Sequence, residues 1–226
     1  CDNCRIVCYN IKMTFYAKKG LFMKKKITNQ SEIYSFDKKL DYETIKQEID
    51  EKLSQLFYDL ENDYNEHKVK ALSNCTIALI QLTNGSRISE AIKTTAFFVK
   101  NPSKTSTLIK ISKRKDKVTR VMKLPININP KILSLISVVF KHYDIDDEKD
   151  LAKLSSKVRT YLYDNFNKIN THSLRYALIN YLSIKKQVPL NLVSKIVGHK
   201  NLNQLITYTQ NHHVDDMLDK LSKNDF

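Results

Sequence analysis

Apolar residues recur every three or four positions through much of the chain after Asp41, and this spacing places them along one face of an α-helix. The first such run consists of Ile45, Ile49, Leu53, Leu56 and Phe57. The pattern therefore predicts a helix that starts at Asp41, followed by several more. Their predicted ranges are 66–82, 89–93, 132–142, 153–166, 173–183, 189–197 and 204–208.

Segments of different composition interrupt this helical pattern. Residues 94–99 are rich in Thr, Phe and Val, and we interpret them as a β-rich run after a short helix. Residues 106–112 and 118–124 are rich in Thr, Ile, Leu and Val and flank a charged turn, which is typical of a β-hairpin. Residues 144–149 are acidic and are expected to form a loop. The fold class that follows is α+β, mainly helical with one small antiparallel sheet.

The first 39 residues show no core-forming period, so we predict an N-terminal extension over residues 1–39 and one larger domain over residues 40–226. Cys1 and Cys4 have the spacing of half a zinc site, but the sequence contains no second pair at a suitable distance. We therefore interpret these cysteines and Cys8 as reduced thiols, and we expect no bound metal.

The composition points to a polyanionic partner. The chain has 38 Lys and Arg against 24 Asp and Glu, a formal net charge of +14, which favours nucleic acid over an acidic membrane surface. It has only 3 Gly and neither a Walker-type loop nor a GxGxxG fingerprint, which argues against a glycine-rich nucleotide site. Because the sequence lacks both a long apolar stretch and a secretory signal, we expect a cytoplasmic protein that does not enter a membrane.

Four short motifs carry candidate chemistry. They are Gly85-Ser86-Arg87-Ile88-Ser89-Glu90, the hairpin turn with Lys113, His172-Ser173-Leu174-Arg175, and Gly198-His199 followed nine positions later by Tyr208. Together they hold every group that phosphodiester cleavage needs without metal. Guanidinium groups stabilise the charge that develops on the phosphate oxygens, a hydroxyl attacks in line, and a Lys or His protonates the departing oxygen.

Read in this order, the motifs resemble the catalytic domain of the tyrosine recombinase, or phage integrase, family, including its Xer-like and its archaeal and viral members. The family pattern has an Arg in a Gly-x-Arg-x-Ser-Glu context, a hairpin Lys, His-x-x-Arg, Gly-His, and a Tyr nine residues after that His. The resemblance extends from about Leu40 to the C-terminus. Each motif alone occurs often by chance, whereas the ordered set with the nine-residue step is specific.

The resemblance implies a role for each matching residue. Tyr208 is the nucleophile that forms a 3′-phosphotyrosyl link, and Arg87 and Arg175 hold the scissile phosphate. His199 supports the same phosphate, and His172 assists with the proton of the tyrosine.

It also implies roles for the charged residues around the hairpin. Lys113 protonates the leaving 5′ oxygen, although Lys115 and Lys117 lie in the same turn and leave the register open by a residue. We assign Lys115 and Lys117 to DNA binding. Glu90 orients the first arginine, and the reaction needs no cofactor.

Other tyrosines could serve as the nucleophile. Tyr161, Tyr163, Tyr176 and Tyr181 lie in predicted apolar helices and do not follow a Gly-His step, so we interpret them as core residues.

The function expected from the resemblance is that of a site-specific DNA recombinase or integrase, which cuts and rejoins double-stranded DNA as a dimer or tetramer and is encoded by a virus or mobile element. Two alternatives remain: a monomeric type IB topoisomerase, and a catalytically silent DNA-binding module. Family members usually carry an N-terminal helical domain, which residues 1–39 are too short to form. The expectation is that this domain was removed or that the protein is a minimal form.

Overall fold

The computed structural model describes residues 40–112, 116 and 118–199. The chain divides into two compact units, Cys1–Lys38 and Lys39–Phe226, and every described residue belongs to the second. The N-terminal cysteines, the hairpin lysines, Tyr208 and the predicted helix at 204–208 all lie outside the described residues. The domain boundary at residue 39 stays a prediction.

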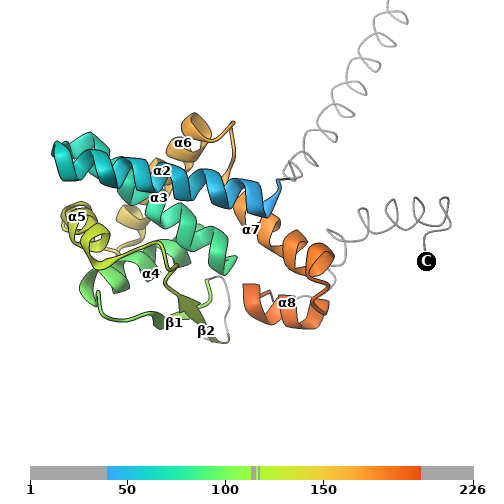
Figure 1. The fold of residues 1–226 in the computed structure, drawn as a ribbon. Helices are drawn as coiled ribbons and strands as arrows, with labels where there is room; N and C mark the ends of the chain where they lie inside the picture. Colours follow the sequence, from blue (N-terminus) through green and yellow to red (C-terminus); the bar gives the residue numbers. More distant parts are fainter. Residues whose placement is uncertain (1–39, 113–115, 117, 200–226) are drawn as a thin grey trace, which may run out of the picture. The chain divides into compact units, whose positions relative to one another are not determined.

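The described part is mainly helical, with a single two-stranded antiparallel sheet, and this confirms the predicted fold class (Figure 1). The elements in order are α2 (Tyr42–Asn62), α3 (Glu66–Asn84), α4 (Ile88–Lys100), β1 (Ser106–Lys110), β2 (Thr119–Lys123), α5 (Pro130–Phe140), α6 (Glu148–Asn165), α7 (Thr171–Asn180), the π-helical turn η2 (Tyr181–Lys185) and α8 (Leu190–Val197). Among these helices, none is both long enough and apolar enough to cross a membrane.

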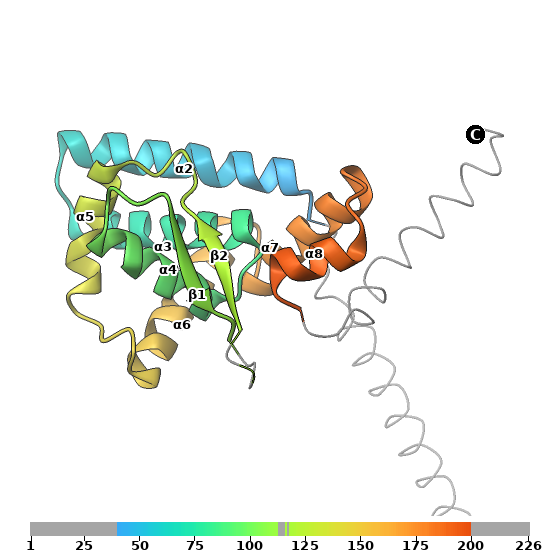
Figure 2. The same ribbon diagram turned by 90° about the horizontal axis from the view of Figure 1, so that it is seen from below.

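Helix α3 lies at the centre of the domain and packs against α2, α4, α5, α6 and α7. Its residues 75–82 are all buried, which explains why its sequence shows apolar residues on nearly every face. Figure 2 shows the hairpin beside α4, and α7 with α8 at the end of the domain away from α5. The two chain segments that precede α4 and α7 meet near the C-terminal end of α3, where the Gln81 side chain bonds to both.

Polar side chains fix where the helices begin. Asp41 caps α2 by accepting a hydrogen bond from the backbone of Thr44, and Asn170 caps α7 through the backbone of Ser173. Two helices end at glycine in the left-handed conformation, α3 at Gly85 with φ 56° and α8 at Gly198 with φ 70°. The predicted end of α8 at residue 197 is correct, whereas α3 continues to Asn84, beyond its predicted end at residue 82.

The hairpin pairs Ser106 with Lys123 and Lys110 with Thr119. Along β2 the side chains alternate between exposed and buried, and the buried ones are Arg120 and Met122. A buried arginine inside a strand is unusual and needs a partner.

The interpretation of residues 94–99 as β-rich chain is wrong, because α4 continues without a break to Lys100. The hydroxyls of Thr94 and Thr95 donate to the carbonyl oxygens of Glu90 and Ala91, four residues earlier, so both threonines are satisfied within the helix. Burial of this helix against α3, α5 and α6 outweighs the strand preference of its Thr, Phe and Val residues.

Three smaller differences concern helix limits and exposure. Helix α6 begins at Glu148 with Asp147 as its cap, five residues before the predicted start. On α8 the apolar residues Leu192 and Ile196 are about half exposed, and only Val193 and Val197 are buried. Tyr163 is also exposed, so its interpretation as a core residue is wrong.

Candidate active site

The turn between α3 and α4 is the centre of the site, and its shape depends on Gly85. A β-carbon at this position would lie 2.8 Å from Leu178 Cδ2 and 2.8 Å from Val197 Cγ1, and the positive φ is itself unfavourable for other residues. The glycine therefore lets the turn approach both α7 and α8 closely. Ser86 and Arg87 follow, and Arg87 is the N-cap residue of α4.

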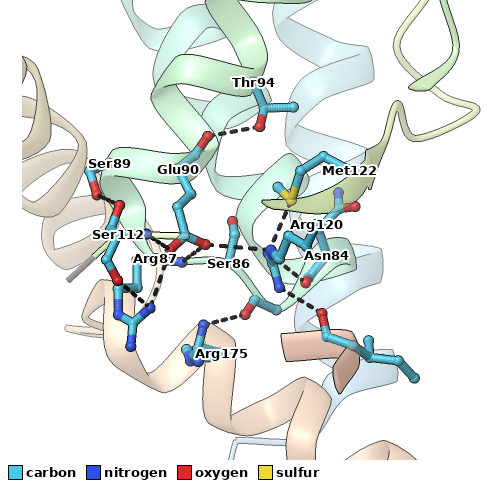
Figure 3. Close-up of polar contacts among 12 residues, drawn as sticks. Asn84, Ser86, Arg87, Ser89, Glu90, Thr94, Ser112, Arg120, Met122 and Arg175 are labelled. Atoms are coloured by element: carbon cyan, nitrogen blue, oxygen red, sulfur yellow. Dashed lines mark hydrogen bonds and ion pairs between the residues drawn. The ribbon is translucent and has the colours of Figure 1, made fainter. Parts of the chain in front are cut away.

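Arg87 and Glu90 form an ion pair within the first turn of α4 (Figure 3). Arg87 Nη1 lies 3.2 Å from Glu90 Oε1, and the backbone N–H of Arg87 donates to Glu90 Oε2 over 3.3 Å. Glu90 is fully buried, whereas the Arg87 side chain remains 25% exposed. The guanidinium is thus held by buried Glu90 on one side, and its other side is accessible to solvent.

The same pair holds the end of the hairpin. The backbone N–H of Ser112 donates to Glu90 Oε1 over 2.9 Å, and Arg87 Nη1 donates to the Ser112 carbonyl oxygen over 3.0 Å. Ser89 and Ser112 also share a hydrogen bond between their hydroxyls. Lys113 is the next residue in the chain, so the contacts of Ser112 fix the point from which the hairpin turn leaves the site.

Arg175 projects from α7 to the other side of the turn. Its Nη1 donates to the Gly85 carbonyl oxygen over 2.7 Å, and the residue is only 4% exposed. Its Nη2 is buried and has no hydrogen-bond partner within the described part of the chain. Burial lowers the pKa of Arg175 to about 10, and the positive charges of Arg87 and Arg120 act in the same direction.

Gln81 fixes the start of α7 relative to this turn. Its buried side-chain nitrogen donates to the carbonyl oxygens of Ser86 and Thr171, over 3.2 and 2.8 Å. One amide therefore joins the segment that leads into Arg87 to the segment that leads into Arg175.

Arg120 is a third guanidinium in the cluster, and it belongs to none of the sequence motifs. Its Nε lies 3.5 Å from Glu90 Oε2, and its side chain is 5% exposed. Burial lowers its pKa, the charge of Glu90 raises it, and the charge of Arg87 lowers it. The signal that could have revealed it is its place in the alternation of β2, where it shares the inward face with Met122.

The two histidines of the motifs have different surroundings. His172 is the second residue of α7; it is exposed, and its ring stacks with Tyr176. His199 is half-buried just beyond α8, where its N–H donates to the Ser194 carbonyl oxygen over 2.9 Å and its own carbonyl accepts from Ser194 Oγ.

The structure therefore brings Arg87, Glu90 and Arg175 into one cluster and places His172 and His199 on the neighbouring helix ends. Tyr208, Lys113, Lys115 and Lys117 lie outside the described residues, so their roles stay predictions. Across residues 40–112, 116 and 118–199, no group of three or more His, Cys, Asp or Glu side chains is arranged to hold a metal ion.

Comparison with known proteins finds relatives in two viruses and an archaeon. The chain is 33% identical to the protein "Putative integrase V10" of Sputnik virophage, over 82% of this chain and 89% of that protein. It is 38% identical to "Putative integrase ORF241" of Acidianus two-tailed virus, over 65% of this chain and 55% of that protein. A Methanocaldococcus jannaschii protein, MJ0770, is 33% identical over 80% of this chain and 85% of its own length.

Two further comparisons complete this picture. No protein-family model matches the chain. Among solved structures, the site-specific recombinase XerH, bound to its difH substrate in a pre-cleavage complex, aligns over 70% of this chain and 48% of that one, with 21% identity and a TM-score of 0.40.

Proposed function

Because the chain belongs to the tyrosine recombinase, or integrase, family of site-specific DNA recombinases, we propose that its guanidinium cluster binds the scissile phosphate of DNA. Arg87 and Arg175 bind the non-bridging oxygens in this proposal. They approach from α4 and α7, on the two sides of the Gly85 turn.

The buried Nη2 of Arg175 is the observation that carries the proposal. A buried N–H donor without a partner is costly, and a charged one more so. A phosphate oxygen is an acceptor that matches guanidinium geometry and neutralises its charge. The depressed pKa of Arg175, to about 10, still leaves the side chain protonated near neutral pH and able to bind this anion.

The proposed reaction is a transesterification. The Tyr208 oxygen attacks the phosphorus, the bond to the 5′ oxygen breaks, and a 3′-phosphotyrosyl link forms. The leaving 5′ oxygen takes a proton from Lys113, and His172 receives the tyrosine proton. Attack by a 5′ hydroxyl on the phosphotyrosine reverses these transfers and rejoins the strand, so the energy of the phosphodiester bond is conserved.

Preorganisation explains how the two arginines favour this step. Arg87 is fixed by Glu90 and Ser112, and Arg175 is fixed by Gly85, so neither must reorganise when charge develops on the phosphate. His199 is placed by the hydrogen bonds around Ser194 and completes the set of donors to the phosphate.

The experiment that tests this function uses DNA selected by repeated rounds of binding from a random duplex pool. A nick placed next to the cleavage position lets a short fragment diffuse away and traps the covalent intermediate. We expect the native protein to form an adduct that withstands denaturant and disappears on protease digestion.

A pair of tyrosine variants makes the test specific. Tyr208→Phe should bind the DNA and form no adduct, whereas Tyr163→Phe, which changes an exposed tyrosine on α6, should form the adduct normally. Binding to the selected site with no adduct from the native protein would leave only a DNA-binding module and would refute the proposal.

The assembly and origin of the protein are also proposals. Recombination exchanges strands between two duplexes, so we propose that at least two protomers act together on DNA; sedimentation of the protein with its selected site measures this directly. The relatives from a virophage and an archaeal virus support an origin on a virus or mobile element. We place the protein in the cytoplasm, with the DNA.

A further inference from the structure

The buried guanidinium of Arg120 contacts three segments that are far apart in the sequence. Its Nη1 donates to the Ile196 carbonyl oxygen over 2.7 Å, and its Nη2 donates to the Asn84 carbonyl oxygen over 3.1 Å and to Met122 Sδ over 3.0 Å (Figure 3). Its Nε faces Glu90.

Two of these acceptors have a common property, because they lie in the last turns of helices. Asn84 is the last residue of α3, and Ile196 is the last but one of α8. Carbonyl groups in the last turn of a helix have no partner within the helix and carry the negative end of its dipole. A single guanidinium therefore satisfies the ends of both helices, and its planar fork sets the distance between them.

Few apolar side chains are buried beneath α8, so the hydrogen bond from Arg120 to its last turn contributes more to holding the helix in place. Within the described part of the chain, the apolar cluster beneath it has three buried members, Ile179, Val193 and Val197, with Tyr176, Leu182 and Val188 partly buried against them. The C-terminal end of α8 also packs directly on Arg120, because a β-carbon on Gly198 would lie 3.4 Å from Arg120 Cδ and 3.0 Å from Ile111 Cδ1.

His199 follows this end of the helix, and Arg87 follows the end of α3 by three residues. The hydrogen bonds from the Arg120 guanidinium to these two backbone carbonyls thus connect the turn that carries His199 to the turn that carries Arg87. Asn84 adds a second link on the same side, since its side chain pairs with both backbone groups of Lys123.

We propose that Arg120 is a positioning residue of the strand-transfer reaction, which holds the Gly198-His199 turn at its working distance from the Arg87 turn. This proposal rests on the proposed function for its catalytic consequence. The structural part, that Arg120 secures the end of α8, stands by itself.

The first test measures this structural part. In Arg120→Lys the charge remains but the fork is lost, so one ammonium group cannot bond both helix ends with the same geometry. Hydrogen–deuterium exchange should then quicken about tenfold or more at the amides of Gly198 and His199, whose acceptors lie in α8. The amides of α2 should be unchanged, and Arg159→Lys, the same substitution at an exposed position of α6, should change neither region. Unchanged exchange at the end of α8 in Arg120→Lys would overturn the proposal.

The second test separates positioning from binding. On the nicked substrate, Arg120→Lys should form adduct about 100-fold more slowly than the native protein while DNA affinity changes much less, because the phosphate is still held by Arg87 and Arg175. If Arg120→Lys cleaves at the native rate, charge alone is sufficient and the positioning role is refuted.

A third experiment distinguishes an effect of Arg120 on α8 from an effect on the hairpin lysine, because Arg120 itself lies on β2 of the hairpin. A substrate with sulfur in place of the leaving 5′ oxygen needs no proton donor, so it should restore cleavage to Lys113→Ala. It should not restore cleavage to Arg120→Lys, and rescue of that variant would assign Arg120 to the hairpin lysine instead.

The tests of the proposed function and of the role of Arg120 can fail independently of each other. If the native protein forms no adduct, the proposed function is wrong, and the exchange measurement still decides whether Arg120 secures α8. Arg120→Met removes the charge as well; if it does not fold, Arg120→Lys alone carries the test.

Discussion

Two regions of this domain are built in different ways. The body formed by α2 to α6 shares one continuous apolar core, in which α3 is buried on nearly all sides. Among the described residues, the end formed by η2 and α8 rests on a small cluster in which Ile179, Val193 and Val197 are buried and Tyr176, Leu182 and Val188 are partly buried. Arg87 belongs to the first region and His199 to the second, and Arg175 on α7 lies between them.

The two parts of the site are therefore held in place by different kinds of interaction. Burial of a large apolar side chain contributes about 1.5–3 kcal/mol, so a body with many such residues holds its turn rigidly. Three buried side chains provide far less, and the position of α8 depends more on polar contacts such as those of Arg120. Regions with few buried contacts open at a lower free energy than the whole domain.

The largest expected effect concerns Arg175, which joins the two regions. Arg175→Gln removes the buried charge and its bond to Gly85, so formation of the covalent adduct should slow by about 100- to 1,000-fold. The rate is measured on the nicked substrate. Arg159→Gln, with the same change of charge at an exposed position of α6, should cleave at the native rate. Equal losses in both variants would mean that overall charge, and not the site, determines the rate.

The next effect tests the body. Leu72 is fully buried in α3, and Leu72→Ala should lower the free energy of unfolding by about 2–5 kcal/mol, because it leaves a cavity in a core that cannot collapse around it. Denaturant titration followed by circular dichroism measures this value. A change below about 1 kcal/mol would show that the core of the body is loosely packed.

A smaller effect is expected from the same type of change in α8. Val193→Ala removes about two buried methyl groups, roughly 1.5 kcal/mol of burial, from a cluster of three residues. Hydrogen exchange in α8 should quicken while exchange in α3 stays slow. If both helices change equally, the two regions unfold as one unit and the comparison fails.

The smallest effect concerns the ion pair between α2 and η2. Lys185 bonds Asp41 and Glu43, and its hydrogen bond holds the pKa of Asp41 at about 2, against 3.8 for a free aspartate. A depressed pKa in the folded state means that the stabilisation is complete above the unfolded value of 3.8 and is lost as the pH falls through 2.

Asp41→Asn keeps the helix cap and removes the charge. Its thermal midpoint should fall at neutral pH by less than that of Val193→Ala, because the pair is solvent-exposed, and the difference from the native protein should shrink as the pH falls through 2 and vanish below it. A difference that persists there would assign the loss to the cap.

Much of this architecture could be predicted from the sequence, because helical periodicity is a local signal. The helices predicted over 66–82 and 189–197 are confirmed for that reason as α3 and α8, within two residues at each end. The helix predicted over 89–93 ends too early, because strand propensity at Thr94 and Thr95 is a local signal, and in α4 burial overrides it.

The site was predicted only as far as its residues form short motifs. Arg87, Glu90 and Arg175 meet in the structure, and the residues that fix the ends of these segments, Gln81 and Arg120, are not part of any motif. Their long-range partners are backbone carbonyls: Thr171 for Gln81, and Asn84 and Ile196 for Arg120. Every residue has a backbone carbonyl, so the sequence does not show which of them accept these hydrogen bonds, and only the structure could reveal the contacts.

The imbalance of charge in the cluster has a thermodynamic consequence. Among the described residues around Glu90, three guanidinium groups face one carboxylate, so the folded protein carries an excess of buried positive charge when no anion is present. An anion that binds this folded site and not the unfolded chain raises stability through linkage, by RT ln(1 + [L]/Kd). Under the proposed function, the phosphate of the substrate is then also a folding ligand, and the protein is most stable when that phosphate is bound.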